Sequence, residues 1–500
     1  MQHRYFGAVA TVLSAGAVFG QVAPPQVGET GMPVINDRQV PRLMESPPAW
    51  GRYVDTDYRD TVGVWTGYLE NGVVVHHKYM VSAQEGRRAL VAVNLMGGVL
   101  WEDEGTRGLT EAALTAWRTA ATKRLASHEL SRALRGMKFG ITATLTSEGV
   151  QVVLEGDRAD LETGFEVLHL LLTEPVVEPF ALETWRENQL EAAHAVRRST
   201  RTYFAEAVND AMFPKGDPRP RSLTPEQVNA VTLERAQAWL DRMIAGAPIE
   251  VAMVGRVPME EMREWAQRYL GSLPARRRPS AELLDTWRSL VPPAGPVSAE
   301  YTIGSTRELI TIGVGYFGPD AVDQRAVRML DIASGILTER IRARLRARAP
   351  GVDGPTIAGG SVALTPGSTY PGFGLLLCAL YAREPGAVDE ARTIAREEFE
   401  RLAAEPPALE DVRRVGADLD AKRIKAAVVP EFWTSVLRSW TVTGLDLVDH
   451  QQGGVQVLTA TPEDVRDAVA RVVQGEPDVT VVLRPRGEVA APKNTVVPAE

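Results

Sequence analysis

The sequence of 500 residues has a single cysteine, Cys378, so it has no internal disulfide. This cysteine lies in the apolar run 374–380, where the residue type usually serves as a small core side chain rather than a reactive thiol. Basic residues are also fewer than acidic ones. The chain has 55 Lys and Arg and 64 Asp and Glu, which gives a net charge of −9. This charge argues against nucleic acid or an acidic membrane surface as a partner.

Histidine is scarce as well, with seven in the chain. Apart from His3, near the N-terminus, no two of them are spaced four residues apart on an expected helix. His76 and His77 are neighbours in an expected strand, and their side chains therefore face opposite sides. The sequence thus lacks the pair of helical histidines that commonly binds zinc, and a zinc hydrolase would have to gather its ligands from scattered positions. The histidines are His3, His76, His77, His128, His169, His194 and His450.

The apolar run at the N-terminus, 6–19, is too short for a bilayer, which needs roughly 20 residues. It follows His3 and Arg4 and ends in small residues, a pattern typical of an export signal. We predict a signal peptide over 1–20, cleaved after Gly20, and a periplasmic or extracellular protein without a membrane span. A retained anchor is the alternative. No cysteine near the cleavage site offers a point for lipid attachment.

Part of the sequence recurs at a constant distance, which indicates two copies of one α+β domain. The predicted boundaries are a Pro-rich arm over 21–65, a first domain over 66–274, a basic and Pro-rich linker over 275–297, a second domain over 298–486 and a tail over 487–500. Five residues recur 229 positions later (461 − 232 = 229): Thr232, Glu234, Arg242, Gly246 and Pro248 return as Thr461, Glu463, Arg471, Gly475 and Pro477.

Periodicity predicts the elements of the first domain, in an α+β order with antiparallel strands. Asn71-Gly72 indicates a hairpin before a strand over 73–77, and a helix is expected to start at Ser127 as its cap. Strands are expected over 89–95, 140–146, 150–155 and 249–254, and helices over 161–173, 181–198 and 233–244.

The stretch 101–114, WEDEGTRGLTEAAL, leads from a strand through a Gly97-Gly98 break into a helix. It resembles the insulinase/pitrilysin family of zinc metallopeptidases, the inverzincins, which carry H-x-x-E-H at this place, with both His as zinc ligands and the Glu as general base. Aligned on Gly105 and the helix, the motif falls on Gly108-Leu-Thr-Glu-Ala112. Glu111 therefore keeps the general-base position, whereas Gly108 and Ala112 have no atom that can bind zinc.

The resemblance covers roughly 66–486 and implies clam-like paired domains. It also implies a third zinc ligand on the long helix, for which Glu191 fits better than Glu187. Glu191 and His194 stand three residues apart, which suits a chelating pair but is also common on charged helices.

In the second domain, the family presents an Arg and, seven residues later, a Tyr that bind substrate. Arg346 matches the Arg, but Asp353 takes the place of the Tyr, and Tyr370 is the next aromatic residue. The alternative for Arg346 and its neighbouring arginines is a solvated helix end.

We therefore expect an exported, non-catalytic homologue of these peptidases with no cofactor, in which no residue is catalytic. Its expected partners are a homologous subunit that carries H-x-x-E-H and an unfolded peptide, which adds to a sheet edge. Two alternatives stay open: an active zinc endopeptidase with a rebuilt metal site, and a peptide-binding or assembly protein with no peptidase partner.

Overall fold

The computed structural model describes residues 43–486, except 45, 82–87, 197–198, 305–308, 348–355 and 476–477. The predicted signal peptide, most of the arm, the tail over 487–500 and Asp353 lie outside the described residues. No helix in the described part of the chain is long and apolar enough to cross a membrane.

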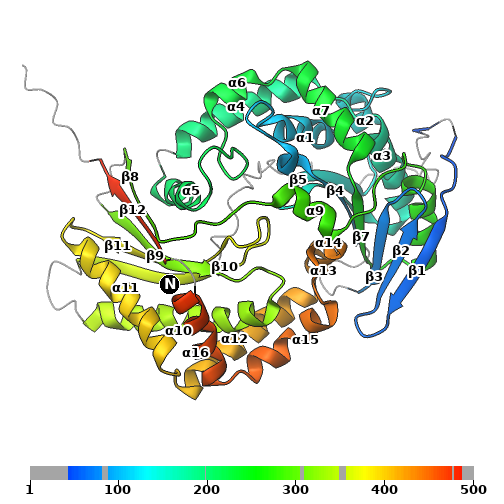
Figure 1. Cartoon of the computed structure of the whole chain (residues 1–500). Helices are drawn as coiled ribbons and strands as arrows, with labels where there is room; N and C mark the ends of the chain where they lie inside the picture. Colours follow the sequence, from blue (N-terminus) through cyan, green and yellow to red (C-terminus); the bar gives the residue numbers. More distant parts are fainter. Residues whose placement is uncertain are drawn as a thin grey trace, which may run out of the picture.

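The first half combines a seven-stranded sheet with helices (Figure 1). Its elements are β1 (Tyr53–Arg59), β2 (Val64–Leu69), β3 (Val74–Tyr79), β4 (Arg88–Met96), η1 (Gly98–Trp101), α1 (Leu109–Thr119), α2 (Ser127–Ala133), β5 (Phe139–Leu145), β6 (Gly149–Asp157), η2 (Arg158–Asp160), α3 (Leu161–Thr173), α4 (Pro179–Val196), α5 (Thr200–Met212), α6 (Pro225–Ala230), α7 (Leu233–Gly246), β7 (Ile249–Gly255), α8 (Met259–Trp265) and η3 (Ala266–Leu270).

The second half has a five-stranded sheet and follows α9 (Ala281–Arg288). Its elements are β8 (Val297–Ile303), β9 (Ile310–Gly318), α10 (Gln324–Ala347), β10 (Ile357–Thr365), β11 (Gly374–Ala382), α11 (Ala387–Ala404), α12 (Leu409–Ala427), α13 (Pro430–Leu437), α14 (Trp440–Thr443), α15 (Leu447–Leu458), α16 (Pro462–Gly475) and β12 (Asp478–Pro485).

The two sheets share one strand order. The first runs β1-β2-β3-β7-β4-β6-β5, and the second, read from its other end, runs β8-β12-β9-β11-β10. The pairs β3·β7 and β8·β12 are both parallel, and the pairs that follow them in each sheet are antiparallel. The second sheet therefore repeats five strands of the first, and β1 and β2 are additions of the first half.

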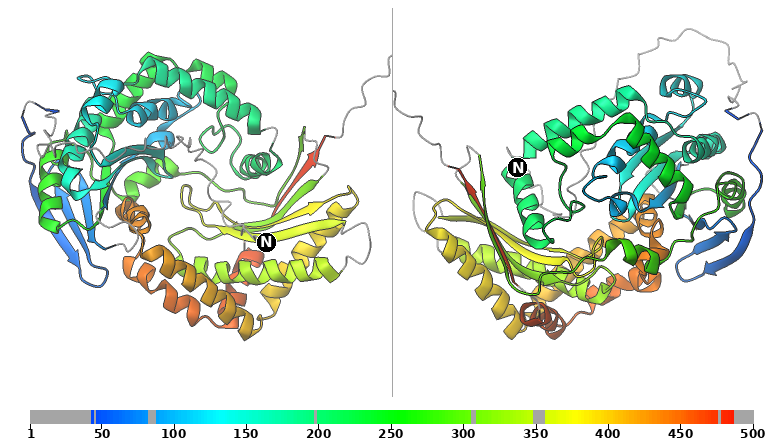
Figure 2. Two further views of the ribbon diagram at one scale, coloured as in Figure 1. Left: turned by 180° about the vertical axis from the view of Figure 1, so that it is seen from behind. Right: turned by 45° about the horizontal axis from the view of Figure 1, so that its top comes forward.

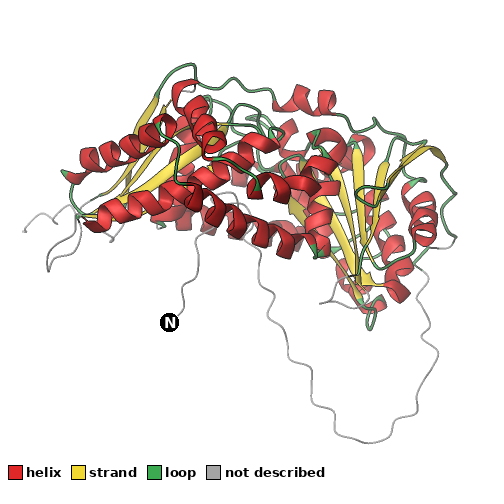
Figure 3. Cartoon of the chain, turned by 90° about the horizontal axis from the view of Figure 1, so that it is seen from below, coloured by secondary structure: helices red, strands yellow, loops and turns green. Residues whose placement is uncertain are grey.

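Each sheet has its own helices on one face and a helix of the other half on the opposite face (Figure 2). On the first sheet, α13 packs against β7 and β4, and its Leu437 is fully buried. On the second sheet, α5 packs against β12, β8 and β9 through Phe204 and its neighbours. The halves thus exchange one helix each, and the two sheets lie at opposite ends of the molecule (Figure 3).

The α+β class with two similar halves is confirmed, but several details differ from the sequence predictions. The sheets are mixed rather than purely antiparallel, since each contains a parallel pair. The predicted arm contains β1 and the start of β2, because these strands pair with each other at the sheet edge. The predicted linker contains α9, which Ser280 caps.

Two local predictions also have a clear outcome. The N-cap of α2 is Ala126 rather than Ser127, and the Glu129 carboxylate accepts a hydrogen bond from the Ala126 amide at 2.9 Å. Cys378 is fully buried in the core of the second half, where burial raises the pKa of its thiol to about 12. The prediction of a core cysteine is therefore confirmed.

Candidate functional site

The chain enters α1 through Gly108, which is not part of the helix. Gly108 is the N-cap of α1 and has a φ of 96°, a left-handed conformation that favours glycine. A Cβ atom at this position would stand 3.2 Å from Cδ2 of Leu223. Ala112, one turn on, is fully buried. The two positions that match the family's zinc ligands are therefore a tight helix start and a packed core residue.

A buried ion pair holds the start of α1. The Glu102 carboxylate accepts hydrogen bonds from the amides of Thr110 at 2.8 Å and Gly108 at 3.2 Å, and from Nη1 of Arg107 at 2.8 Å. A carboxylate at this end of a helix is favoured, because it bonds free amides and faces the positive end of the helix dipole. Both side chains of the pair are at most 4% exposed.

Arg107 also connects α1 to the segment that follows α5. Its Nε donates to the carbonyl of Pro218 at 3.1 Å, and its Nη2 donates to the carbonyl of Arg221 at 2.8 Å. The guanidinium is thus bonded on all sides and holds this segment against the helix start.

Glu111 keeps the general-base position on α1 and is nearly buried. Burial raises the pKa of its carboxyl, while Arg107, whose Nη1 lies 3.8 Å from Oε1, opposes this increase. Arg118, two turns along the helix, is a second nearby cation, and burial lowers the pKa of its guanidinium. A carboxyl with a raised pKa suits a general base, but base chemistry in the family depends on a metal-bound water, for which positions 108 and 112 provide no ligands.

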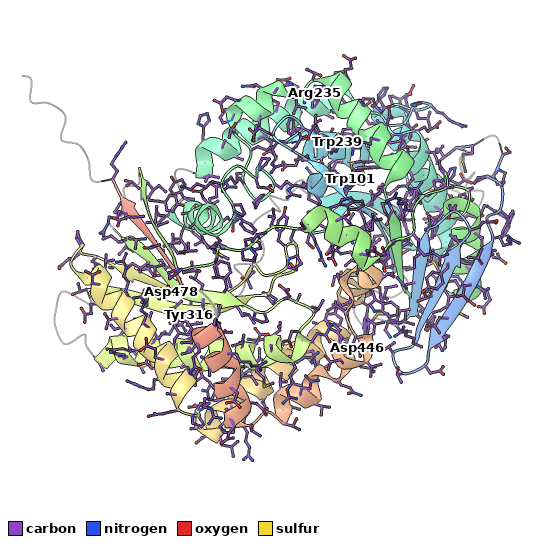
Figure 4. The ribbon with its side chains drawn as sticks, viewed as in Figure 1. Trp101, Arg235, Trp239, Tyr316, Asp446 and Asp478 are labelled. Carbon is purple, nitrogen blue, oxygen red and sulfur yellow. The ribbon has the colours of Figure 1, made fainter. Side chains whose placement is uncertain are left out.

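Aromatic side chains cover the helix start from the side of α7. Nε1 of Trp239 donates to Oγ1 of Thr110 at 3.0 Å. The Arg242 guanidinium lies 5.0 Å from the Trp239 ring and 5.2 Å from the Trp101 ring, and the two tryptophans lie near each other in Figure 4. Sequence reasoning missed this cluster, since its members come from distant positions without a shared local pattern.

An open strand edge lies beside α1. β5 pairs only with β6 among the described strands, and it packs against α1. Hydrogen bonds run from Thr146 N to Gly149 O and from Asp157 N to Lys138 O, both 2.9 Å long. Because backbone groups alternate in direction along a strand, these bonds show that the even-numbered residues of β5 bond β6. The amides and carbonyls of residues 139, 141, 143 and 145 therefore point outward, and Nε of Arg118 bonds the carbonyl of Ala143 at 3.1 Å.

Comparison with known proteins finds a family match over part of the sequence and a similar fold over most of the chain. The family model "Peptidase M16 inactive domain" matches residues 230–417, which lie outside α1. No curated protein matches the sequence.

Solved structures are similar over most of the chain. The periplasmic protease PqqL from Escherichia coli has a TM-score of 0.75 at 16% identity and covers 94% of this chain and 49% of its own. The ferredoxin protease FusC, an E83A mutant in complex with Arabidopsis ferredoxin, has a TM-score of 0.70 at 14% identity, with the same coverage. A peptidase M16 inactive domain from Pseudomonas fluorescens has a TM-score of 0.69 at 13% identity and covers 85% of this chain and 98% of its own.

Residues 230–417 match the M16 inactive domain, and the whole chain is an M16 homologue in fold, similar to insulinase-like proteins. It spans about half the length of PqqL and FusC. At these identities the solved structures show the fold alone. That fold is the two-domain fold described above.

The other metal-ligand candidates of this M16 homologue are on the surface. Glu187, Glu191 and His194 are all exposed on α4, which packs against α1 through other residues. No group of three or more His, Cys, Asp or Glu side chains in the described part of the chain is arranged to hold a metal ion. The residues at positions 108, 112 and 191 therefore do not fit a zinc ion in this structure.

The substrate-binding candidate of the second half, Arg346, and Tyr370, the next aromatic residue, have different surroundings. Arg346 is exposed near the end of α10. Tyr370 is buried between β10 and β11, where its ring contacts Phe213 and lies 5.7 Å from the Arg219 guanidinium. Burial raises the pKa of Tyr370 to about 12. Tyr370 is thus a packing residue between the halves, and a substrate role for Arg346 stays a prediction.

Proposed function

We propose that this M16 homologue is an exported, non-catalytic subunit that binds unfolded peptide next to α1. One observation carries the proposal: the two zinc-ligand positions are a left-handed N-cap, Gly108, and a fully buried Ala112, while the open edge of β5 beside them is kept. Loss of the metal positions removes hydrolysis, whereas a strand edge still binds a chain by main-chain hydrogen bonds.

The edge of β5 suits an extended peptide. Its outward amides and carbonyls repeat every second residue, which matches the spacing of an added strand, and Arg118 already bonds one of these carbonyls, that of Ala143. The side chains of Phe139, Ile141 and Leu145 are partly buried against the core and hold the strand in place. Recognition by backbone groups is tolerant of sequence, as a subunit that receives unfolded segments requires.

Export and a peptidase partner belong to the same proposal. The periplasmic location of PqqL supports export of this chain. Both PqqL and FusC contain about as much again as the length matched here, which supports a second, homologous chain as the partner. The partner is expected to carry the H-x-x-E-H motif.

The test is binding and cleavage of a fluorescently labelled, unstructured dodecapeptide by the purified chain. Anisotropy is expected to show binding without cleavage. Ile141→Pro removes one outward amide and the matching hydrogen bond, and the affinity is expected to fall about tenfold, which corresponds to about 1.4 kcal/mol. Ile141→Ala keeps the amide and is expected to change affinity less than about twofold.

Metal content and Glu111→Gln complete the test. Elemental analysis after dialysis against trace zinc is expected to find no stoichiometric metal, and Glu111→Gln is expected to leave peptide affinity unchanged. Cleavage that requires zinc and disappears in Glu111→Gln would establish an active peptidase and overturn the proposal. Equal affinity of the Ile141→Pro and wild-type chains would reject β5 as the binding edge.

A further inference from the structure

Besides β1 and β2, the two halves differ at the position that η3 occupies in the first half. In the first half, η3 follows β7 and packs beside α3. Phe165 on α3 stacks on Tyr269 with a centroid distance of 6.0 Å, and Nδ1 of His169 bonds the carbonyl of Tyr269 at 2.8 Å. Tyr269 is 1% exposed, so η3 fills this position completely.

The helix α11 corresponds to α3 with an offset of 231, which Glu174-Pro175 and Glu405-Pro406 give directly after the two helices (405 − 174 = 231). The buried faces agree with this offset, since Gly164, Leu168 and Leu171 correspond to the buried Ala395, Phe399 and Leu402. At the same offset, Phe165 and His169, the residues of α3 that contact Tyr269, correspond to Arg396 and Glu400. Leu161, one turn earlier on α3, corresponds to Arg392.

The strands beside the helix show the same change from apolar to polar. Val251 of β7 faces Val75 of β3 in the ladder, and both are buried in the core of the first half. Their counterparts are Thr480 of β12, at an offset of 229 (480 − 251 = 229), and Ser298, its ladder partner on β8. Polar residues have thus replaced the apolar lining on both sides.

Among the described residues of the second half, this position is a groove of about 530 Å³ between α11 and the β8 end of the sheet. Tyr316 and Asp478, two of its lining residues, lie next to each other in Figure 4. Among the described residues, β8 pairs only with β12, so its other side is an open strand edge along the groove.

The charges of the groove are only partly satisfied. Arg396 donates to the Asp478 carboxylate at 2.7 Å. In the described part of the chain, the one ion pair of Arg392 is with Asp389, at 3.2 Å, and that carboxylate is 90% exposed. Nε of Arg392 is buried and has no hydrogen-bond partner in the described part of the chain. A buried donor of this kind calls for an acceptor, and a carboxylate is the strongest one.

We propose that this groove binds an extended, acidic peptide segment of a partner protein. The segment pairs with the open edge of β8 and places one carboxylate against Arg392. Glu400, which also lines the groove, repels a second acidic side chain at the other end and so fixes the direction of the segment. This site is separate from β5 and does not rest on peptide binding there.

The test uses a labelled, extended hexapeptide of alternating valine and threonine with one central glutamate, and a matched peptide with glutamine. The full chain is expected to bind the glutamate peptide about tenfold more tightly in fluorescence anisotropy, because a charged hydrogen bond is gained. Arg392→Gln is expected to abolish this difference, and Arg413→Gln, an exposed arginine on α12, is expected to keep it. N-methylation of alternate peptide amides is expected to abolish binding.

Three results would overturn the proposal. Equal affinity for the two peptides shows that the groove does not recognise the carboxylate. An unchanged preference in Arg392→Gln shows that another residue binds it. A large gain in affinity after deletion of 487–500 assigns the groove to that segment of the chain itself. Ile141→Pro is the further control, since it is expected to affect only the β5 edge and to leave the preference for glutamate intact.

Discussion

At the scale of single residues, the backbone conformation of Gly108 argues more strongly against a zinc site than the absence of the two histidines does. Where only the side chain of a metal ligand has been replaced, the reverse substitution restores the metal site. Gly108 has also taken a backbone conformation that side chains disfavour, and Leu223 packs over it. The position that matches the family's first zinc ligand is thus part of the packing of the helix start.

We therefore expect Gly108→His combined with Ala112→His to fail to restore a zinc site. The left-handed conformation costs a non-glycine residue about 1 to 2 kcal/mol, and a histidine at 112 overpacks a fully buried position. Elemental analysis is expected to find no stoichiometric zinc, and calorimetry a lower Tm. Ala112→His alone is the control for overpacking. One zinc per chain in the double variant would show that the helix start can rearrange.

His77 makes stability depend on pH. Burial lowers the pKa of its imidazole to about 4 from an ordinary value of 6.5, although its hydrogen bond to the Val257 carbonyl and the nearby Glu260 oppose this. The unfolded chain then binds a proton more readily than the folded chain, so stability is present above pH 6.5 and is lost as the pH falls toward 4.

Between pH 7 and pH 5 the wild-type chain is expected to lose about 2 kcal/mol through His77. His77→Gln does not titrate, and its loss over this range is expected to be smaller by that amount in denaturant unfolding. Burial also lowers the pKa of His169 and His450, and both are present in the two chains, so the difference isolates His77. Parallel losses in both chains would contradict the assignment.

At the scale of elements, the exchange of α5 and α13 joins the two halves. Each helix belongs to one half by sequence and packs on the sheet of the other. The buried pair of His76 and Glu250 in the first sheet lies beneath this contact, and the Thr441 amide at the start of α14 donates to the Glu250 carboxylate at 2.7 Å. The joint therefore combines an apolar helix face with a buried polar contact.

We expect Leu437→Ala, in α13, to weaken this joint. Removal of a fully buried leucine costs about 2 to 5 kcal/mol. Because Leu437 lies between the halves, calorimetry is expected to show two separate transitions. Leu402→Ala, fully buried within α11, is the matched control, and its cost is expected to fall on the second half while the halves stay coupled. A single shifted transition in both variants would argue against α13 as the coupling element.

At the scale of the whole molecule, the chain matches about half of PqqL and of FusC. Under the proposed function, the remaining half of their length corresponds to a second chain, the subunit with the motif.

The partner prediction is tested by affinity purification of the tagged chain from its own cells under native conditions. Mass spectrometry is expected to identify a homologous chain that carries H-x-x-E-H in about equal amount. Sedimentation of the complex is expected to give about twice the 54.5 kDa of this chain. Co-purification of a partner with no such motif, or of no protein at all, would favour the assembly-protein alternative.

The sequence alone determined the elements and the class of fold, because hydrophobic periodicity is a local property. The helix over 161–173 and the strand over 249–254 were predicted within one residue of α3 and β7. The constant offset of 229 also predicted two similar domains, and the loss of both histidines was visible in the motif itself. Local patterns missed β1 and α9, since Pro-rich composition concealed elements that tertiary packing stabilises.

Only the tertiary structure decided what replaced the site. The bonds of Arg107 to the carbonyls of Pro218 and Arg221, the cover of Trp239 and Leu223, and the burial of Tyr370 against Phe213 all join residues far apart in the chain, and no spacing rule brings them together. The groove beside α11 likewise depends on long-range packing, because its lining comes from α11, β8, β9 and β12. The sequence determines which side chains are present, but backbone conformation and long-range packing determine which of them are in contact.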